Sequence, residues 1–139
     1  MTTDKSDGIF PRGQRAPSEY FMGTAWVLPL VPKDETGTFT IGNVEFEPGC
    51  RNNWHTHPRG QILLVTDGIG WYQERGKAAR PLAKGDVVVI PSGVEHWHGA
   101  SRDSSFTHIA ISNLGVSGPV TWLGRVTDEE YKAVHEKKN

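Results

Sequence analysis

Short apolar segments, separated by turn residues, run along most of this sequence. Sixteen glycines and nine prolines fall between the segments, which contain many β-branched and aromatic residues and lack a helical period. This pattern predicts an all-β sandwich or small barrel. We expect strands at residues 21–30, 38–46, 54–57, 61–66, 69–74, 87–90, 95–98, 106–111 and 120–123.

The two ends of the chain differ from this pattern. Thr127 and Glu130 have the spacing of a capping box, so we expect a short helix from about Asp128, with His135 on a solvated face. Residues 1–18 are polar and contain two prolines. They are expected to form an N-terminal arm, either mobile or ordered against a partner subunit, before a single domain over residues 19–139.

Composition narrows the possible partners. The 15 basic and 16 acidic residues form no long block of one sign, so we expect neither nucleic acid nor a membrane as partner, but a small molecule. No apolar run approaches the roughly 20 residues of a membrane span, and no secretory core is visible at the start, which predicts a cytoplasmic protein. Cys50 is the only cysteine, so a metal would need His, Asn, Gln or carboxylate ligands.

The candidate chemistry is carried by two histidine pairs. Side chains two apart on a strand share a face, so His55 and His57 project together, as do His96 and His98. Histidines that converge inside a small barrel would make a nitrogen-rich pocket suited to a divalent transition metal. The spacing alone leaves that convergence open.

Both stretches resemble the two cupin motifs. The first departs from the common pattern by having Gln in place of Glu, and the second ends at Ala100, where Asn is common. The first reads Gly49, five residues, His55, one residue, His57, three residues, Gln61, six residues and Gly68. The second reads Gly85, five residues, Pro91, one residue, Gly93, two residues and His96.

The resemblance implies an all-β fold, a cupin jelly-roll β-barrel with a short C-terminal helix, and one metal held by His55, His57, Gln61 and His96. A cupin that has lost its metal is the alternative. Gln61 would coordinate through a neutral oxygen and leave the full charge of the ion, which favours Lewis-acid chemistry. Three imidazoles and an amide oxygen suit Mn(II), Fe(II), Zn(II), Ni(II) or Co(II).

The stretches "VEFEPGCRNNWHTHPRGQ", "GDVVVIPSGVEHWHGA", "FTHIAI" and "VTDEEY" also resemble the manganese-dependent hydroxynitrile lyase cupins and the cupins associated with carboxymuconolactone decarboxylase domains. This resemblance implies Mn(II) as the metal and reversible cleavage of a cyanohydrin of the mandelonitrile type, with His108 and His98 moving protons. The alternative for His108 is a structural role as a buried, hydrogen-bonded side chain. The alternative for His98 is to orient His96 or a bound water.

Other residues near the motifs have weaker assignments. Trp54 and Trp97 are expected to pack between sheets or subunits, Arg51 either enters the pocket or forms a surface ion pair, and Cys50 is passive. Six residues are candidates for the substrate pocket, and core packing would explain them equally well: Thr40, Gly42, Val44, Phe46, Ala110 and Ser112.

Two further functions stay open at this point. One is a metal-dependent dioxygenase of a small diketone, enol or alkene, and the other is a cupin that binds a small ligand without turnover. By analogy with small cupins we expect a homo-oligomer, a dimer or tetramer.

Overall fold

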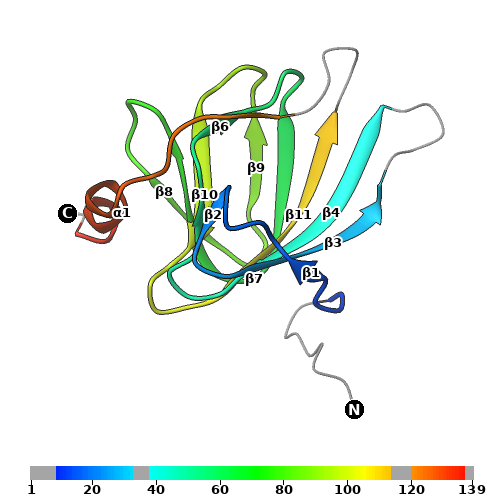
Figure 1. The fold of residues 1–139 in the computed structure, drawn as a ribbon, viewed down its shortest axis with the longest axis horizontal. Coiled ribbons are helices and arrows are strands. Elements are labelled where there is room, and N and C mark those ends of the chain that lie inside the picture. The colour runs from blue at the N-terminus through cyan, green and yellow to red at the C-terminus, as the bar shows by residue number, and fades with distance from the viewer. Residues whose placement is uncertain (1–8, 33–37, 114–119, 137–139) are drawn as a thin grey trace.

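The chain folds as a curled antiparallel sheet with a short helix packed outside it (Figure 1). The computed structural model describes residues 9–32, 38–113 and 120–136. This architecture confirms the predicted all-β class and the C-terminal helix. The elements are β1 (Gln14–Arg15), β2 (Phe21–Met22), β3 (Ala25–Val31), β4 (Phe39–Phe46), β5 (Arg51–Asn52), β6 (His55–Thr56), β7 (Gln61–Glu74), β8 (Arg80–Ala83), β9 (Val87–Ile90), β10 (His96–Ala100), β11 (Phe106–Asn113), β12 (Thr121–Trp122) and α1 (Asp128–His135).

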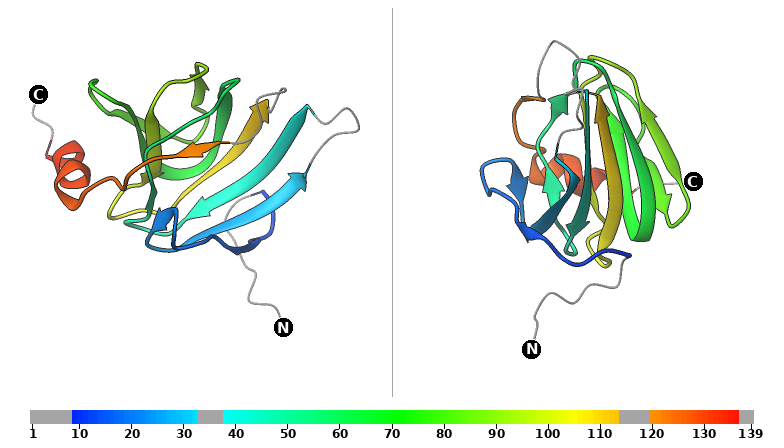
Figure 2. Two further views of the ribbon diagram at one scale, coloured as in Figure 1. Left: turned by 45° about the horizontal axis from the view of Figure 1, so that its top comes forward. Right: turned by 90° about the vertical axis from the view of Figure 1, so that its right-hand side faces the viewer.

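The strands form two sides of a half-barrel that are joined by β7. Neighbouring strands follow the order β1-β3-β4-β11-β7-β10-β5-β2, β6 lies between β10 and β12, and both β8 and β9 pair with β7. Figure 2 shows the two sides curving toward each other. The concave interior therefore receives side chains from both sides.

The long strand β7 corrects one prediction. We expected two strands separated by a turn near Gly68, but β7 runs unbroken from Gln61 to Glu74. Its first part pairs with β11 and β9, and its second part pairs with β10 and β8. Gly68 has a φ of 79°, and a Cβ there would lie 2.0 Å from the carbonyl oxygen of Ser105. Glycine thus allows a bend where the strand passes from one side to the other.

Other boundaries differ for local reasons. The expected strand over residues 21–30 is interrupted at Gly23, whose φ is 96°, and forms β2 and β3. In the expected strand over residues 54–57 only β6 is extended and paired. Three strands were not predicted, because β1 and β5 have two polar residues each and β8 is mostly exposed.

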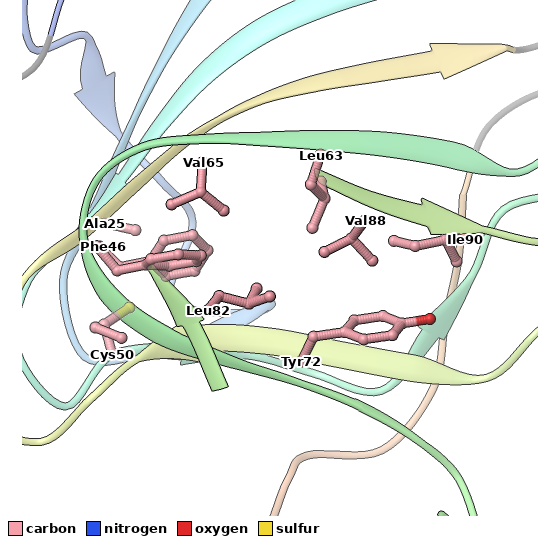
Figure 3. Close-up of a cluster of buried hydrophobic side chains, with 11 residues drawn as sticks. Ala25, Phe46, Cys50, Leu63, Val65, Tyr72, Leu82, Val88 and Ile90 are labelled. Carbon is pink, nitrogen blue, oxygen red and sulfur yellow. The ribbon is translucent and has the colours of Figure 1, made fainter. Parts of the chain in front are cut away.

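The hydrophobic core lies in the concave interior (Figure 3). Burial alternates along strand β9: Val88 and Ile90 are each 1% exposed, whereas Val87 and Val89 are 51% and 69% exposed. Burial of each such side chain contributes about 1.5–3 kcal/mol. The labelled members of this cluster are Ala25, Phe46, Cys50, Leu63, Val65, Tyr72, Leu82, Val88 and Ile90.

Helix α1 begins as predicted. The Thr127 hydroxyl accepts the backbone N–H of Glu130, and the Glu130 carboxylate accepts the backbone N–H of Thr127, which completes the capping box. The prediction for His135 was wrong. It is half-buried, its Nε2 accepts the backbone N–H of Arg102 at 3.1 Å, and its ring contacts Tyr131.

Arg51 on β5 connects the sheet to α1. Its guanidinium donates to the carbonyl of Val126 and to Asp128, at 2.9 and 2.8 Å, and lies over the Tyr131 ring. The Tyr131 hydroxyl in turn donates to the Ala100 carbonyl at 2.6 Å. The Arg51 side chain is only 6% exposed and does not line the pocket described below. The predicted ion pair is therefore formed, with the exposed Asp128, but Arg51 itself is buried against α1 and does not enter the pocket.

The described part of the predicted N-terminal arm, residues 9–18, lies against its own chain. β1 pairs with β3, and Arg12 forms an ion pair of 2.8 Å with Glu45 on β4. Residues 1–8 lie outside the described part of the chain. Within that part, α1 is too short and too polar to cross a bilayer.

Candidate metal centre

Adjacent strands bring three predicted ligands together. On β6 and β10, His55 and His96 are direct pairing partners, and their ring centroids are 4.1 Å apart. His57 follows β6, and its ring centroid lies 5.0 Å from that of His55 and 5.4 Å from that of His96. Strand pairing therefore gathers imidazoles that are distant in sequence.

Buried polar atoms in this cluster fit a metal ion. Nε2 of His57, Nε2 of His96 and Oε1 of Gln61 are buried and have no hydrogen-bond partner among the described residues. Gln61 already donates from its Nε2 to the Ser112 hydroxyl at 3.0 Å, which leaves Oε1 as an acceptor. Unpartnered buried acceptors are costly. A divalent cation would satisfy all three, so the donor set fits the predicted metal.

Two of the histidines are oriented by backbone carbonyls. Nδ1 of His55 lies 2.7 Å from the Asn53 carbonyl oxygen, and Nδ1 of His96 lies 2.9 Å from that of Val94. Because a carbonyl only accepts, each Nδ1 carries the ring proton. Each Nε2 then keeps its lone pair, which is the arrangement common for metal-binding histidines.

Distance alone allows a second ligand set. His55, His96 and His98 each place a ring nitrogen within 4.8 Å of the other two. Both sets contain His55 and His96. The predicted set adds His57 and Gln61, and the second set adds His98. The unpartnered atoms of His57 and Gln61 favour the set with those two residues.

His98 is already engaged on another side. Its Nδ1 lies 3.2 Å from Nε2 of His108. The Asn52 Oδ1 accepts the His98 backbone N–H at 3.0 Å, and the Asn52 Nδ2 lies 3.3 Å from Nδ1 and 3.4 Å from Nε2 of the His98 ring. The structure thus brings the two predicted catalytic histidines into contact. Asn52, which holds one of them, was not predicted.

A cavity of about 190 Å³ adjoins these histidines. Of the six predicted pocket residues, Val44, Phe46 and Ala110 line it. Thr40 and Gly42 do not, and Ser112 instead contacts Gln61. The sequence reasoning missed five lining residues: Phe21, Val27, Asn52, Val120 and Trp122.

Burial keeps the clustered histidines neutral. It lowers the pKa of His57 to about 4 and that of His108 to about 3. It also lowers the pKa of His96, and it lowers those of His55 and His98 well below the usual range. For His55, His57 and His98 the neighbouring imidazoles add to the effect. Neutral imidazoles are the form that binds metals and accepts protons.

These pKa values predict an acid-labile metal-free protein. An unfolded histidine has a pKa of about 6.5. Below that pH, His57 and His108 are protonated in the unfolded state but remain neutral in the folded state. Their contribution to stability is complete above about pH 6.5 and is lost as the pH falls toward about 4 and then about 3. Each such histidine adds a slope of about 1.4 kcal/mol per pH unit.

Urea unfolding of metal-free protein across this pH range measures that slope. We expect the free energy of unfolding to fall steadily below about pH 6.5, and less steeply in His108→Phe. A free energy that stays constant down to about pH 4 would contradict the assignment of buried neutral histidines.

The remaining predicted residues have structural surroundings. The Trp54 and Trp97 indoles donate to Glu130 and Gln73, and both rings pack in a second apolar cluster with α1 rather than between sheets. Cys50 is buried, and burial raises its thiol pKa to about 12, which agrees with a passive role.

The half-barrel and the imidazole cluster inside it define a β-barrel protein with a candidate divalent-metal site. A family model described as "Cupin domain" matches residues 42–111, which include every predicted metal ligand. The chain therefore belongs to the cupin family.

Individual relatives extend this result. The chain is 42% identical over 118 residues to a protein of Granulicella tundricola named (R)-mandelonitrile lyase, covering 85% of this chain and 90% of that protein. A crystallised cupin-like protein of Thermotoga maritima is 54% identical, with a TM-score of 0.90, covering 95% of this chain and all of that one. A DMSP lyase of Ruegeria pomeroyi, 21% identical with a TM-score of 0.59 over 74% of this chain and 51% of that one, shares the fold alone.

Proposed function

We propose that this cupin is a metal-dependent lyase that splits a small cyanohydrin reversibly into an aldehyde and cyanide. The observation that carries the proposal is one apolar cavity with two chemical parts. It is lined by His57 and Gln61, whose Nε2 and Oε1 have no hydrogen-bond partner, and by the contacting pair His98 and His108. The 42% identity to a mandelonitrile lyase adds support.

His55, His57, Gln61 and His96 would hold the metal, for which we propose Mn(II). When bound, the ion supplies Lewis acidity that lowers the pKa of a substrate hydroxyl. Since all four side chains are neutral, they leave the charge of the ion undiminished.

The proton steps fall to the histidine pair. The His108 imidazole, which burial keeps neutral, accepts the substrate hydroxyl proton. As the carbonyl forms, the C–C bond breaks and cyanide leaves with the electron pair. The proton then passes from His108, directly or through His98, to cyanide, which leaves both rings neutral.

The direct test is benzaldehyde release from mandelonitrile by manganese-loaded protein at mildly acidic pH, where uncatalysed decay is slow. We expect the manganese-loaded protein to release benzaldehyde well above the buffer rate, and the metal-free protein to release it no faster than buffer. If metal is shown to be bound and the rate still equals that of buffer, mandelonitrile is excluded as a substrate. Iron-dependent consumption of dioxygen would instead support an oxygenase.

The expected homo-oligomer stays a prediction. Ile62 on β7 and Val87 and Val89 on β9 are exposed on adjacent strands of the outer face, and exposed aliphatic clusters often mark interfaces. If a second copy covers this face, Val89→Asp should shift the mass measured by light scattering to that of one chain. An unchanged oligomer would place the interface elsewhere, and a monomeric wild type would contradict the prediction.

A further inference from the structure

One wall of the cavity is a tryptophan held on both of its sides. Trp122 lies on β12, which pairs with β6, and its direct partner in the ladder is His55. The Trp122 ring centroid is 4.8 Å from that of His55. On another side the Tyr20 ring stacks on Trp122 with centroids 4.5 Å apart and an interplanar angle of 12°. Trp122 is therefore fixed beside a predicted metal ligand.

The backing of Trp122 is itself attached to the sheet. The Tyr20 carbonyl accepts the backbone N–H of Asn53 at 2.9 Å, and the Glu19 carbonyl accepts the Asn53 side-chain amide at 3.2 Å. Phe21 lies against Trp122 with centroids 6.2 Å apart and also lines the cavity. The indole consequently has little room to move aside for a larger ligand.

Size and charge define what fits against this wall. None of the described residues that line the cavity carries a charged side chain at neutral pH, so a cationic ligand would be desolvated without compensation. A cavity of about 150 Å³ accommodates benzene, so about 190 Å³ leaves room for one ring and a few further atoms.

We propose that Trp122 is a specificity-determining residue that limits the substrate to compounds with at most one ring. This inference rests on the proposed function for the reaction, but the wall itself is tested by binding. Removing the indole should open the cavity toward Tyr20 and admit a fused two-ring group. Loss of the Tyr20 ring should have the same effect more weakly, because Trp122 would then be free to shift.

The experiment compares binding of benzyl alcohol and naphthylmethanol to manganese-loaded protein by calorimetry. It also compares kcat/KM for the cyanohydrins of benzaldehyde and naphthaldehyde. The variants are Trp122→Leu, Trp122→Phe as a milder change that preserves an aromatic core, and Tyr20→Leu. Trp26→Leu is the matched control, because Trp26 contacts Arg12 and Glu47 and does not line the cavity.

We expect wild type and Trp26→Leu to bind benzyl alcohol and reject naphthylmethanol, and Trp122→Leu to raise the naphthyl-to-phenyl ratio by about 10- to 100-fold. Equal binding of both alcohols by wild type, or an unchanged ratio in both Trp122 variants, would overturn the inference. If binding discriminates but neither cyanohydrin is cleaved, the wall is supported and the proposed reaction fails. Cleavage of both cyanohydrins by wild type with equal kcat/KM would contradict the size limit set by Trp122 and leave the proposed reaction standing.

Discussion

His96→Ala is expected to abolish metal binding and, with it, cyanohydrin cleavage. His96 is fully buried and pairs directly with His55, and its Nε2 has no other partner in the described part of the chain. Groups that merely orient a metal ligand are worth about 10- to 100-fold in metal affinity. Loss of a ligand should exceed that range, and the cleavage rate should fall to that of buffer.

Metal content after dialysis and the rate of benzaldehyde release measure the two effects together. His135→Ala is the matched control, because this histidine lies on α1 outside the cavity and should retain both metal and rate. A folded His96→Ala that keeps stoichiometric metal would contradict the ligand assignment.

His108→Ala is expected to lower kcat by about 10²- to 10⁴-fold, the usual contribution of a general base, while leaving the metal in place. The reason is the position of His108 on β11, where it lines the cavity and contacts His98 rather than His55 or His57. Metal content therefore separates its role from that of the ligands.

His108→Gln preserves side-chain hydrogen bonding without a comparable base, and it guards against a collapse of the cavity in the alanine variant. Both variants should lose rate to a similar degree. An undiminished kcat in either folded variant would exclude His108 as the base, and simultaneous loss of metal would give it a structural part in the metal site.

Short apolar segments bounded by turn residues were enough to predict the fold class and several strands, because a strand that packs into a core needs only a few apolar residues between turns. β9 illustrates this success, although its four aliphatic residues do not show which two are buried, and α1 was predicted from its capping box. The continuity of β7 could not be predicted in the same way. Asp67 and Gly68 look like a hairpin turn, and only the close approach of Ser105 shows that the glycine serves a bend.

The parity of neighbouring residues also has a limit near the site. Arg51 shares parity with His55, but β5 ends at Asn52 and β6 begins at His55, so the intervening residues break the alternation. Asn52 therefore lines the cavity, whereas Arg51 contacts α1. Trp122 was missed for another reason: its place beside His55 follows from strand pairing across the chain, which no local pattern records.

The most direct test of the metal site compares His57→Ala with His98→Ala by metal content after loading and dialysis. His57 belongs to the ligand set indicated by its unpartnered Nε2 and by Oε1 of Gln61, and His98 belongs to the alternative set given by distance. We expect one manganese per chain in wild type, retained in His98→Ala and lost in His57→Ala. Metal retained in His57→Ala and lost in His98→Ala would contradict this expectation.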